Sequence, residues 1–312
     1  MTAGLSCRST TPEDLPALAA FFADRFGHSW SPEEWTWKYR SLPGEARSLV
    51  AVDAADGAIL AHGGALRLPA RWRGREVGIW QLVDWAGTPR RRGLRPPLVE
   101  LGQRLLADLP AEGDAPWIFG FPSARHFRLG ERVFGYLPLA EFEELAGPLP
   151  AIPAPAGSLV EISDSCGGWA EAVWEACGVE GVRRSAAFLN WRYYARPHRY
   201  YRYYRLSSRG IEGLAVFAYV VGGEAWAVEL WLPPGGDWLP SLLAVAADLR
   251  DSGLERWRFW PPPPGAGPDL TALGLRPSGE RRFVGCRGRA GGADPVEAAR
   301  GFFYAMGDYD LV

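Results

Sequence analysis

A repeated passage constrains the fold of this chain more than any other sequence feature. Residues 36–61 and 190–215 match without a gap at an offset of 154 in a chain of 312 residues. Solenoid repeats recur every 20 to 50 residues or so, and no such period is present. Repetition at half the chain length therefore predicts two like domains, with chance similarity as the alternative. The shared positions are Trp37-Lys38-Tyr39 and Pro43 against Trp191-Arg192-Tyr193 and Pro197, then Leu60-Ala61 against Leu214-Ala215.

The composition limits the classes of protein that this chain can belong to. With 47% hydrophobic residues, 22% charged residues and a net charge of −2, it has material for two cores but no basic field for nucleic acid. The four cysteines form no CxxC pair, so neither a disulfide framework nor a metal site is expected. No apolar run reaches the roughly 18 residues of a membrane span. We therefore expect no membrane segment and a cytoplasmic location.

The first half contains signals for a compact α/β arrangement. Cap and proline signals at Thr11-Pro12 and Ser31-Pro32 predict two helices, and three strands with short turns predict an antiparallel meander. A helix between the next two strands makes them parallel neighbours, so the sheet is mixed. The expected helices cover 15–26, 35–39, 98–109 and 123–133, and the expected strands 5–8, 48–53, 59–68, 77–85, 117–121 and 136–142.

The same order of elements recurs after a proline-rich stretch. Residues 147–157 carry no periodic apolar pattern and predict an extended linker. We therefore expect an α/β (α+β) chain of two tandem domains, 1–146 and 158–312, each a mixed, mostly antiparallel sheet flanked by helices. The second half is expected to hold helices at 169–176, 188–193, 238–249 and 270–273, and strands at 159–162, 200–206, 214–221, 225–232, 256–260 and 282–286.

The passage Gln81-Leu82-Val83-Asp84-Trp85-Ala86-Gly87-Thr88-Pro89-Arg90-Arg91-Arg92-Gly93-Leu94, together with this order of elements, resembles the acyl-CoA-binding core of the GCN5-related N-acetyltransferases. In that family a loop of the pattern Arg/Gln-x-x-Gly-x-Gly/Ala follows the fourth strand and leads into a helix. Its main-chain N–H groups bind the pyrophosphate of CoA, helped by the helix dipole. The stretch 117–123 and the turn Phe134-Gly135-Tyr136 resemble the fifth strand and the closing turn of the same fold.

This chain departs from the family's loop pattern. If Arg90 takes the first position, Gly93 fits but Arg95 replaces the last small residue; if Arg92 does, Arg95 and Pro97 stand at the glycine positions. One interpretation is that arginines bind the phosphates directly, because guanidinium groups match phosphate oxygens. The alternative is a solvated basic turn in a domain that has lost its cofactor. The candidate loop residues are Arg90, Arg91, Arg92, Gly93, Leu94 and Arg95.

The resemblance also implies where the thioester arm and the reacting groups lie. In this fold the fourth and fifth strands splay apart, so Val83, Trp85 and Phe119 are expected at the strand ends beside the pantetheine arm, with Ser123 opening the next helix. Asp84 is the candidate base, and the alternative is a carboxylate that caps a turn or pairs with an arginine.

The candidate acids lie on the helix that follows the fifth strand. The family's usual acid is a tyrosine there, and this chain has Glu131 instead. His126 on the same helix is a second candidate, with an ordinary surface histidine as the alternative.

The second half lacks the corresponding loop. Residues 232–238 place Asp237 where an anion would bind, so we expect no CoA in the second domain, and Glu229 on its fourth strand is expected to pair with an arginine or to face a vacated cleft. The alternating Tyr/Arg run 200–205 is expected to form a strand, rather than a stacking platform for single-stranded nucleic acid. The aromatic tail 302–310 resembles the end of such two-domain proteins and is expected to dock on a domain.

Two hypotheses of function follow. The first is an N-acyltransferase that uses acetyl-CoA or another acyl-CoA and acts on a small-molecule amine, without nucleic acid, membrane or metal. The second is a non-catalytic binding or scaffold protein in which both domains have lost the cofactor.

Overall fold

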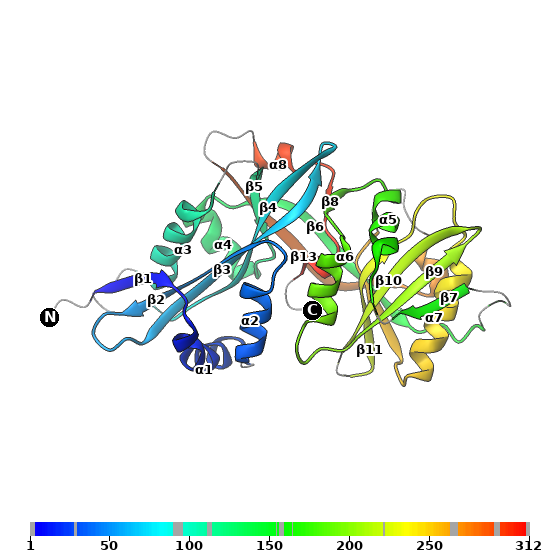
Figure 1. Ribbon diagram of the computed structural model, residues 1–312, viewed down its shortest axis with the longest axis horizontal. Helices are drawn as coiled ribbons and strands as arrows, with labels where there is room; N and C mark the ends of the chain where they lie inside the picture. Colours follow the sequence, from blue (N-terminus) through cyan, green and yellow to red (C-terminus); the bar gives the residue numbers. More distant parts are fainter. Residues whose placement is uncertain are drawn as a thin grey trace. The chain divides into compact units, whose positions relative to one another are not determined.

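The structure is a computed structural model that describes residues 4–27, 30–89, 96–110, 114–153, 155, 159–163, 165–220, 222–262, 268–289 and 294–309. The chain forms two compact units, each drawn from two segments. The first comprises Met1–Ala140 and Val284–Arg300, and the second comprises Glu141–Phe283 and Gly301–Val312. The predicted fold class is confirmed: mixed, mostly antiparallel sheet flanked by helices (Figure 1).

Local sequence signals fix the helices of the first unit. Ser31 Oγ accepts a hydrogen bond from Glu34 N at 3.2 Å, and the Glu34 carboxylate accepts one from Ser31 N at 2.9 Å, which closes a capping box at the start of α2. Gly27 ends α1 in the left-handed conformation that glycine adopts without strain. The helices of this unit are η1 (Pro12–Asp14), α1 (Leu15–Phe26), α2 (Pro32–Arg40), α3 (Pro97–Asp108), α4 (Ala124–Phe134) and α8 (Pro295–Ala298).

The sheet of the first unit has an antiparallel meander and one parallel pair. Strands β1 (Leu5–Ser9), β2 (Glu45–Asp53), β3 (Ile59–Trp72) and β4 (Arg75–Gly87) pair in sequence order. Strand β5 (Asp114–Gly120) then runs parallel to β4, because α3 carries the chain back across the sheet.

Helices cover both faces of this sheet, and successive side chains along a strand point to opposite faces. Leu49 and Ala51 of β2 face α3, where they pack with Leu101 and Leu105. Their neighbours, such as Val50, face α1 and pack with its buried apolar residues (Figure 1). Because side chains alternate between the faces along each strand, each face of the sheet has its own hydrophobic core.

The second unit repeats this order of elements. Its strands β9, β10 and β11 form the antiparallel meander, and β12 runs parallel to β11 after helix α7. Its elements are β7 (Leu159–Ser163), α5 (Gly168–Ala176), β8 (Glu180–Val182), α6 (Ala186–Leu189), the π-helical turn η2 (Asn190–Tyr194), β9 (Tyr201–Ser208), β10 (Ile211–Val220), β11 (Glu224–Trp231), α7 (Leu239–Asp251), β12 (Arg256–Phe259), η3 (Leu270–Leu273), β14 (Phe302–Phe303) and η4 (Met306–Asp308).

The last strand of each half departs from the sequence expectation. Strand β6 (Leu137–Pro148) includes part of the expected linker, and its residues from Glu141 onward belong to the second unit, where they pair with β12. Strand β13 (Arg276–Gly288) ends in the first unit, where Gly285–Gly288 pair with β5. The two halves therefore exchange their closing strands. An apolar pattern identifies a strand but not the strand with which it pairs. Dividing the sequence into two consecutive domains therefore could not predict this exchange.

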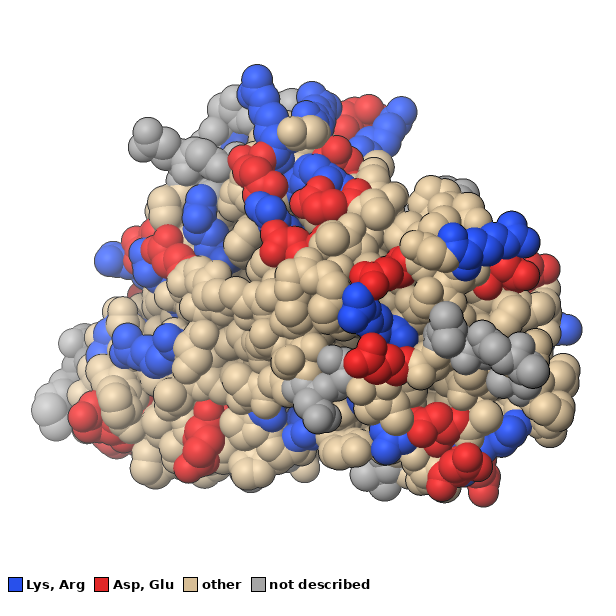
Figure 2. Space-filling model, turned by 45° about the vertical axis from the view of Figure 1, so that its right-hand side comes forward, with Lys and Arg blue, Asp and Glu red and all other residues tan. Residues whose placement is uncertain are grey.

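Charged residues of both signs are interspersed on the face shown in Figure 2. This distribution is consistent with the net charge of −2. No helix among the described residues is long and apolar enough to cross a membrane.

Candidate functional site

The first unit contains a fork between two parallel strands. The β4–β5 ladder runs from Gly78 and Asp114 to Leu82 and Gly120. Strand β5 ends there, whereas β4 continues to Gly87 with β3 as its partner. The edge of β4 beyond Leu82 therefore no longer has β5 as a ladder partner. Val83 and Phe119, both buried, lie at this fork.

A β-bulge shapes the fork on the β4 side. Gly64 pairs with Val83 and His62 with Ala86, so that Asp84 and Trp85 together lie opposite a single residue of β3. Asp84 has a φ of 56°, in the left-handed region that Asp tolerates better than most residues. The bulge turns the Asp84 carbonyl toward His62 Nδ1 at 2.9 Å, and Trp85 Nε1 donates to Gly64 O at 2.9 Å.

The carboxylate of Asp84 is held by two residues of α2. Lys38 Nζ lies 3.0 and 2.9 Å from its two oxygens, and the Tyr39 hydroxyl donates to it at 2.6 Å. The side chains of Lys38 and Asp84 are only 2% and 4% exposed. Lys38, the sole lysine of the chain, also lies 4.5 Å from the centre of the Trp30 ring. The partner of Asp84 is thus a lysine from α2, where the sequence suggested an arginine of the next turn.

His62 extends this cluster to the other side of the bulge. Because the Asp84 carbonyl can only accept, Nδ1 of His62 carries the proton, and Nε2 accepts from Ser48 Oγ at 2.9 Å. Ser48 in turn contacts Thr10 Oγ1 at 2.8 Å. Burial lowers the pKa of His62 to about 4, and the charge on Lys38 contributes in the same direction. His62 is therefore neutral at physiological pH and acts here as a structural donor.

We expect acidification to destabilise the protein through His62. Because its pKa is about 4 when folded and about 6.5 when unfolded, the unfolded state binds more protons between these values, and stability falls as the pH drops through this window. The difference corresponds to about 3 kcal/mol. Chemical denaturation at pH 7 and at pH 4 should show a loss of this size that is larger in the parent protein than in a His62→Gln variant. Equal losses in both proteins would contradict the assignment.

The three candidate residues at α4, Ser123, His126 and Glu131, lie in different environments. Ser123 caps the helix by accepting from His126 N at 3.3 Å. The His126 ring lies 5.9 Å from that of Trp85, and its Nε2 is buried without a hydrogen-bond partner among the described residues. Burial lowers the pKa of His126 to about 4. Glu131 is exposed, and no ion pair or hydrogen bond joins it to other residues that the structure describes.

The arginine-rich loop, Arg90, Arg91, Arg92, Gly93, Leu94 and Arg95, lies outside the described residues. The helix that follows it offers few donors of its own. Pro97 at the start of α3 has no N–H, and the N–H groups of Val99 and Glu100 donate to Pro96 O at 3.0 and 3.3 Å. Any phosphate binding at this position must therefore depend on the loop rather than on the first turn of α3.

The second unit has a counterpart of the Asp84 cluster. Tyr193, the repeat partner of Tyr39, donates to Glu229 on β11 at 2.6 Å, as Tyr39 does to Asp84 on β4. A bulge also interrupts β11 next to Glu229. The cation is different, because Arg184 rather than a residue of the repeated passage contacts Glu229, with Nε 2.9 Å from both oxygens. Each copy thus joins a tyrosine to a buried carboxylate on its fourth strand.

The loop before α7 is held by Ser208 of β9 and packed by Trp238. Asp237 N donates to Ser208 Oγ at 2.8 Å. The Trp238 ring packs so closely on Gly236 that a Cβ added there would lie 2.3 Å from it. One main-chain donor of this loop, Asp237 N, is therefore already used and is not free for an anion.

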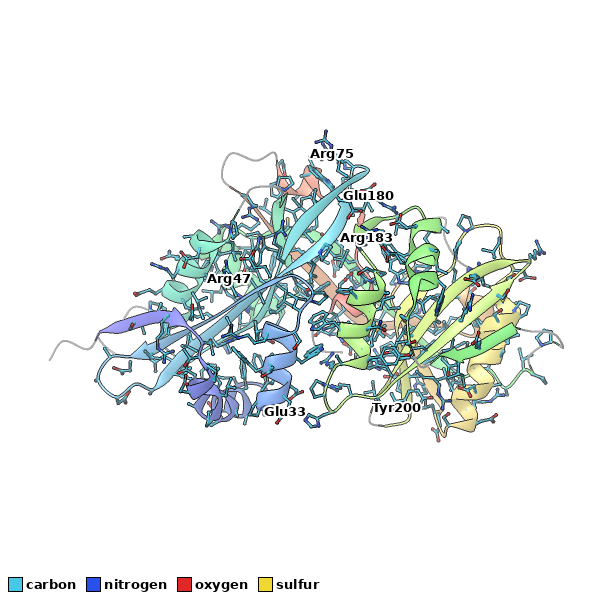
Figure 3. All side chains as sticks on the ribbon, in the orientation of Figure 1. Glu33, Arg47, Arg75, Glu180, Arg183 and Tyr200 are labelled. Atoms are coloured by element: carbon cyan, nitrogen blue, oxygen red, sulfur yellow. The ribbon has the colours of Figure 1, made fainter. Side chains whose placement is uncertain are left out.

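Three of the four tyrosines in the Tyr/Arg run are part of the core. Tyr201, Tyr203 and Tyr204 are buried, whereas Tyr200, just before β9, is 58% exposed (Figure 3). Arg202 lies against Asp248, and Arg205 against Glu212. Residues 201–205 therefore lie in strand β9, and their buried rings cannot stack on bases.

Sequence reasoning missed Lys38 and Tyr39 as site residues. Both stand in the repeated Trp37-Lys38-Tyr39 passage, so the signal was present, but it was interpreted only as evidence of duplication. Among the described residues no group of His, Cys, Asp or Glu could hold a metal ion, and the four cysteines are free.

The architecture is that of the GCN5-related N-acetyltransferases. A probable N-acyltransferase of unknown function from Enterococcus faecalis V583 superposes with a TM-score of 0.67 at 14% identity, over 91% of this chain and 73% of that one. A GCN5-related N-acetyltransferase from Kribbella flavida gives 0.64 at 16% identity, over 92% and 71%.

A further GCN5-related N-acetyltransferase, from Sphaerobacter thermophilus, gives a TM-score of 0.54 at 19% identity and matches over nearly its whole length, 93% of this chain and 97% of that one. No protein-family model and no curated protein sequence matches the chain. At these identities the similarity defines the fold.

Proposed function

We propose that the first unit binds an acyl-CoA at the β4–β5 fork and transfers the acyl group to a small-molecule amine. The observation that carries this proposal is the fork itself. The ladder ends at Leu82 and Gly120, and the bulge at Asp84 re-aims the adjoining main chain of β4. Main-chain groups of Val83 and Trp85 can hold the amides of the pantetheine arm, near Phe119 and Ser123, and the arginines of the 90–95 loop can hold the phosphates.

The fit is better for the arm than for the phosphates. An open strand edge suits an extended amide chain, whereas Pro97 and the acidic Glu100 weaken the first turn of α3 as an anion site. The proposal therefore depends on Arg90, Arg91, Arg92 and Arg95. In the second unit the loop is closed by Ser208 and Trp238, and we propose that this unit binds no cofactor.

When bound, the acyl-CoA supplies an activated thioester. The amine must lose a proton before it can attack, and the thiol that leaves must gain one. His126 is the best placed of the three sequence candidates. Its Nε2 has no hydrogen-bond partner among the described residues, its ring is neutral at physiological pH, and it lies beside Trp85 at the bulge. We assign proton transfer to His126. Asp84 is a positioning residue, because Lys38 and Tyr39 occupy its carboxylate; Glu131 remains a candidate at the exposed rim.

Calorimetry with acetyl-CoA and longer acyl-CoAs tests this proposal. Replacing Arg90, Arg91 and Arg92 together by glutamate should weaken binding roughly 100-fold or more, since several phosphate contacts are reversed in sign. The control, Asp237→Lys in the second unit, should bind as the parent does. His126→Gln should keep binding but slow release of free CoA thiol in the presence of amines by roughly 100-fold. No heat and no thermal shift with any acyl-CoA would instead identify a non-catalytic binding protein.

A further inference from the structure

The C-terminal segment of the chain occupies the second unit's fork. We call residues 302–309 the tail segment. It begins with β14, which pairs parallel with β8 through Phe302 and Glu180, and the Phe303 ring lies 5.6 Å from that of Trp231 on β11. The segment then passes along β11 through η4.

The middle of the tail segment lies directly against the edge of β11. A Cβ added to Gly307 would lie 2.8 Å from Val228 O, 2.4 Å from Glu229 Oε1 and 2.1 Å from the Tyr193 hydroxyl. The β11–β12 ladder ends at Trp226 and Arg258, just before this point. The tail segment therefore contacts β11 at the position that corresponds to the bulge of β4, and only glycine fits there.

Charged groups recognise the residues on either side of Gly307. Asp308 lies 2.9 Å from Arg184 Nη2, with both side chains 1% exposed. Arg192 donates from Nε to Gly307 O at 3.1 Å and from Nη2 to Tyr309 O at 2.9 Å. The Tyr309 ring lies 5.9 Å from the Trp260 ring, with the Arg282 guanidinium 5.5 Å from its centre. Arg192 thus donates to two main-chain carbonyls of the tail segment, and the buried carboxylate of Asp308 lies beside the cation of Arg184.

The internal repeat shows that this recognition is particular to the second copy. Arg192 stands at the position of Lys38. Lys38 contacts the carboxylate of the fourth strand in its own copy. In the second copy Arg184 contacts the corresponding carboxylate, and Arg192 binds the tail segment. A guanidinium presents several donors in one plane and can hold two carbonyls at once, which an ammonium on a similar stem does less readily.

We propose that the fork beside β11 is a peptide-binding site and that the tail segment is its resident ligand. The site takes a short extended peptide with a glycine against β11, followed by an acidic residue at Arg184 and an aromatic residue at Trp260. The inference does not involve acyl-CoA, so it stands or falls independently of the proposed function.

Peptide exchange in the nicked protein tests this proposal. Arg300 and Gly301 form a turn with the Arg300 side chain 76% exposed, so a protease site inserted there can be cleaved after the full chain has folded. The released segment should co-elute with the protein, and a labelled synthetic peptide of residues 301–312 should replace it saturably. A peptide with Asp308→Asn should bind roughly 10- to 100-fold more weakly, as expected for loss of a charged contact. A peptide with Gly307→Val, or a scrambled peptide, should not compete.

Separate elution of the segment from nicked protein that is still folded, with no binding of the labelled peptide, would overturn the proposal. A second measurement needs no insertion. In the intact chain, Arg192→Lys should accelerate amide hydrogen exchange of residues 302–309 about tenfold or more while leaving β2 of the first unit unchanged. Unchanged exchange in the tail segment would also overturn it.

Discussion

Replacing Arg184 by methionine will destabilise the second unit by about 3–5 kcal/mol, the usual cost of removing one partner from a buried ion pair. Arg184 lies 2.9 Å from both Glu229 and Asp308, and all three side chains are at most 1% exposed. Burial disfavours the charged guanidinium, but the two carboxylates outweigh this and raise the pKa of Arg184. Methionine keeps much of the side-chain volume while leaving two carboxylates without their cation.

Hydrogen exchange monitored by mass spectrometry can assign this loss to one unit. Amides of Glu224–Trp231 should exchange roughly 10² to 10⁴ times faster in Arg184→Met, while those of β3 in the first unit stay as in the parent. Adding Glu229→Gln and Asp308→Asn should restore most of the protection, because neutral amides leave no uncompensated charge. Normal protection in Arg184→Met alone would show that the buried charges are compensated in another way.

Replacing Lys38 by methionine should have a comparable effect on the first unit, about 3–5 kcal/mol. The Asp84 carboxylate is 4% exposed and accepts from both Lys38 and Tyr39. After the change, only the Tyr39 hydroxyl of these two donors remains. Because Asp84 adopts a left-handed backbone at the bulge, its loss of a charged partner should also loosen the fork. Exchange at β4, compared with β11 as the internal reference, measures the effect.

The double variant Lys38→Met with Asp84→Asn is the matched control. Asparagine tolerates the left-handed conformation and still accepts the Tyr39 hydrogen bond, but it carries no charge. It should therefore recover most of the stability lost in Lys38→Met. If the double variant is as unstable as the single one, packing of the lysine stem beside Trp30, and not its charge, stabilises this cluster.

The helices and strands could be predicted largely because their signals are local. The helix expected at 15–26 coincides with α1, since Pro12, Asp14 and Gly27 mark its start and end within a few residues of chain. The strands β8 and β14 escaped prediction because each is short and is defined by its partner rather than by its own pattern.

The candidate site was less predictable from sequence. The repeat pairs Tyr39 with Tyr193 at an offset of 154, but Asp84 and Glu229 are 145 residues apart, since the β10–β11 hairpin is shorter than the β3–β4 hairpin. A fixed offset therefore cannot align the two carboxylates. Only the ladders and the two tyrosine contacts identify them as counterparts.

The sequence by itself predicted a chain built of two like halves, most of the helices and strands in each half, and a difference between the loops that precede α3 and α7. These properties follow from short-range periodicity, caps and composition. The tertiary structure alone decided that the closing strands are exchanged, that Lys38 and Arg192 serve different partners, and that the tail segment occupies the second fork. Ladder partners and buried ion pairs join residues far apart in the chain, and their energies depend on burial, which no local pattern specifies.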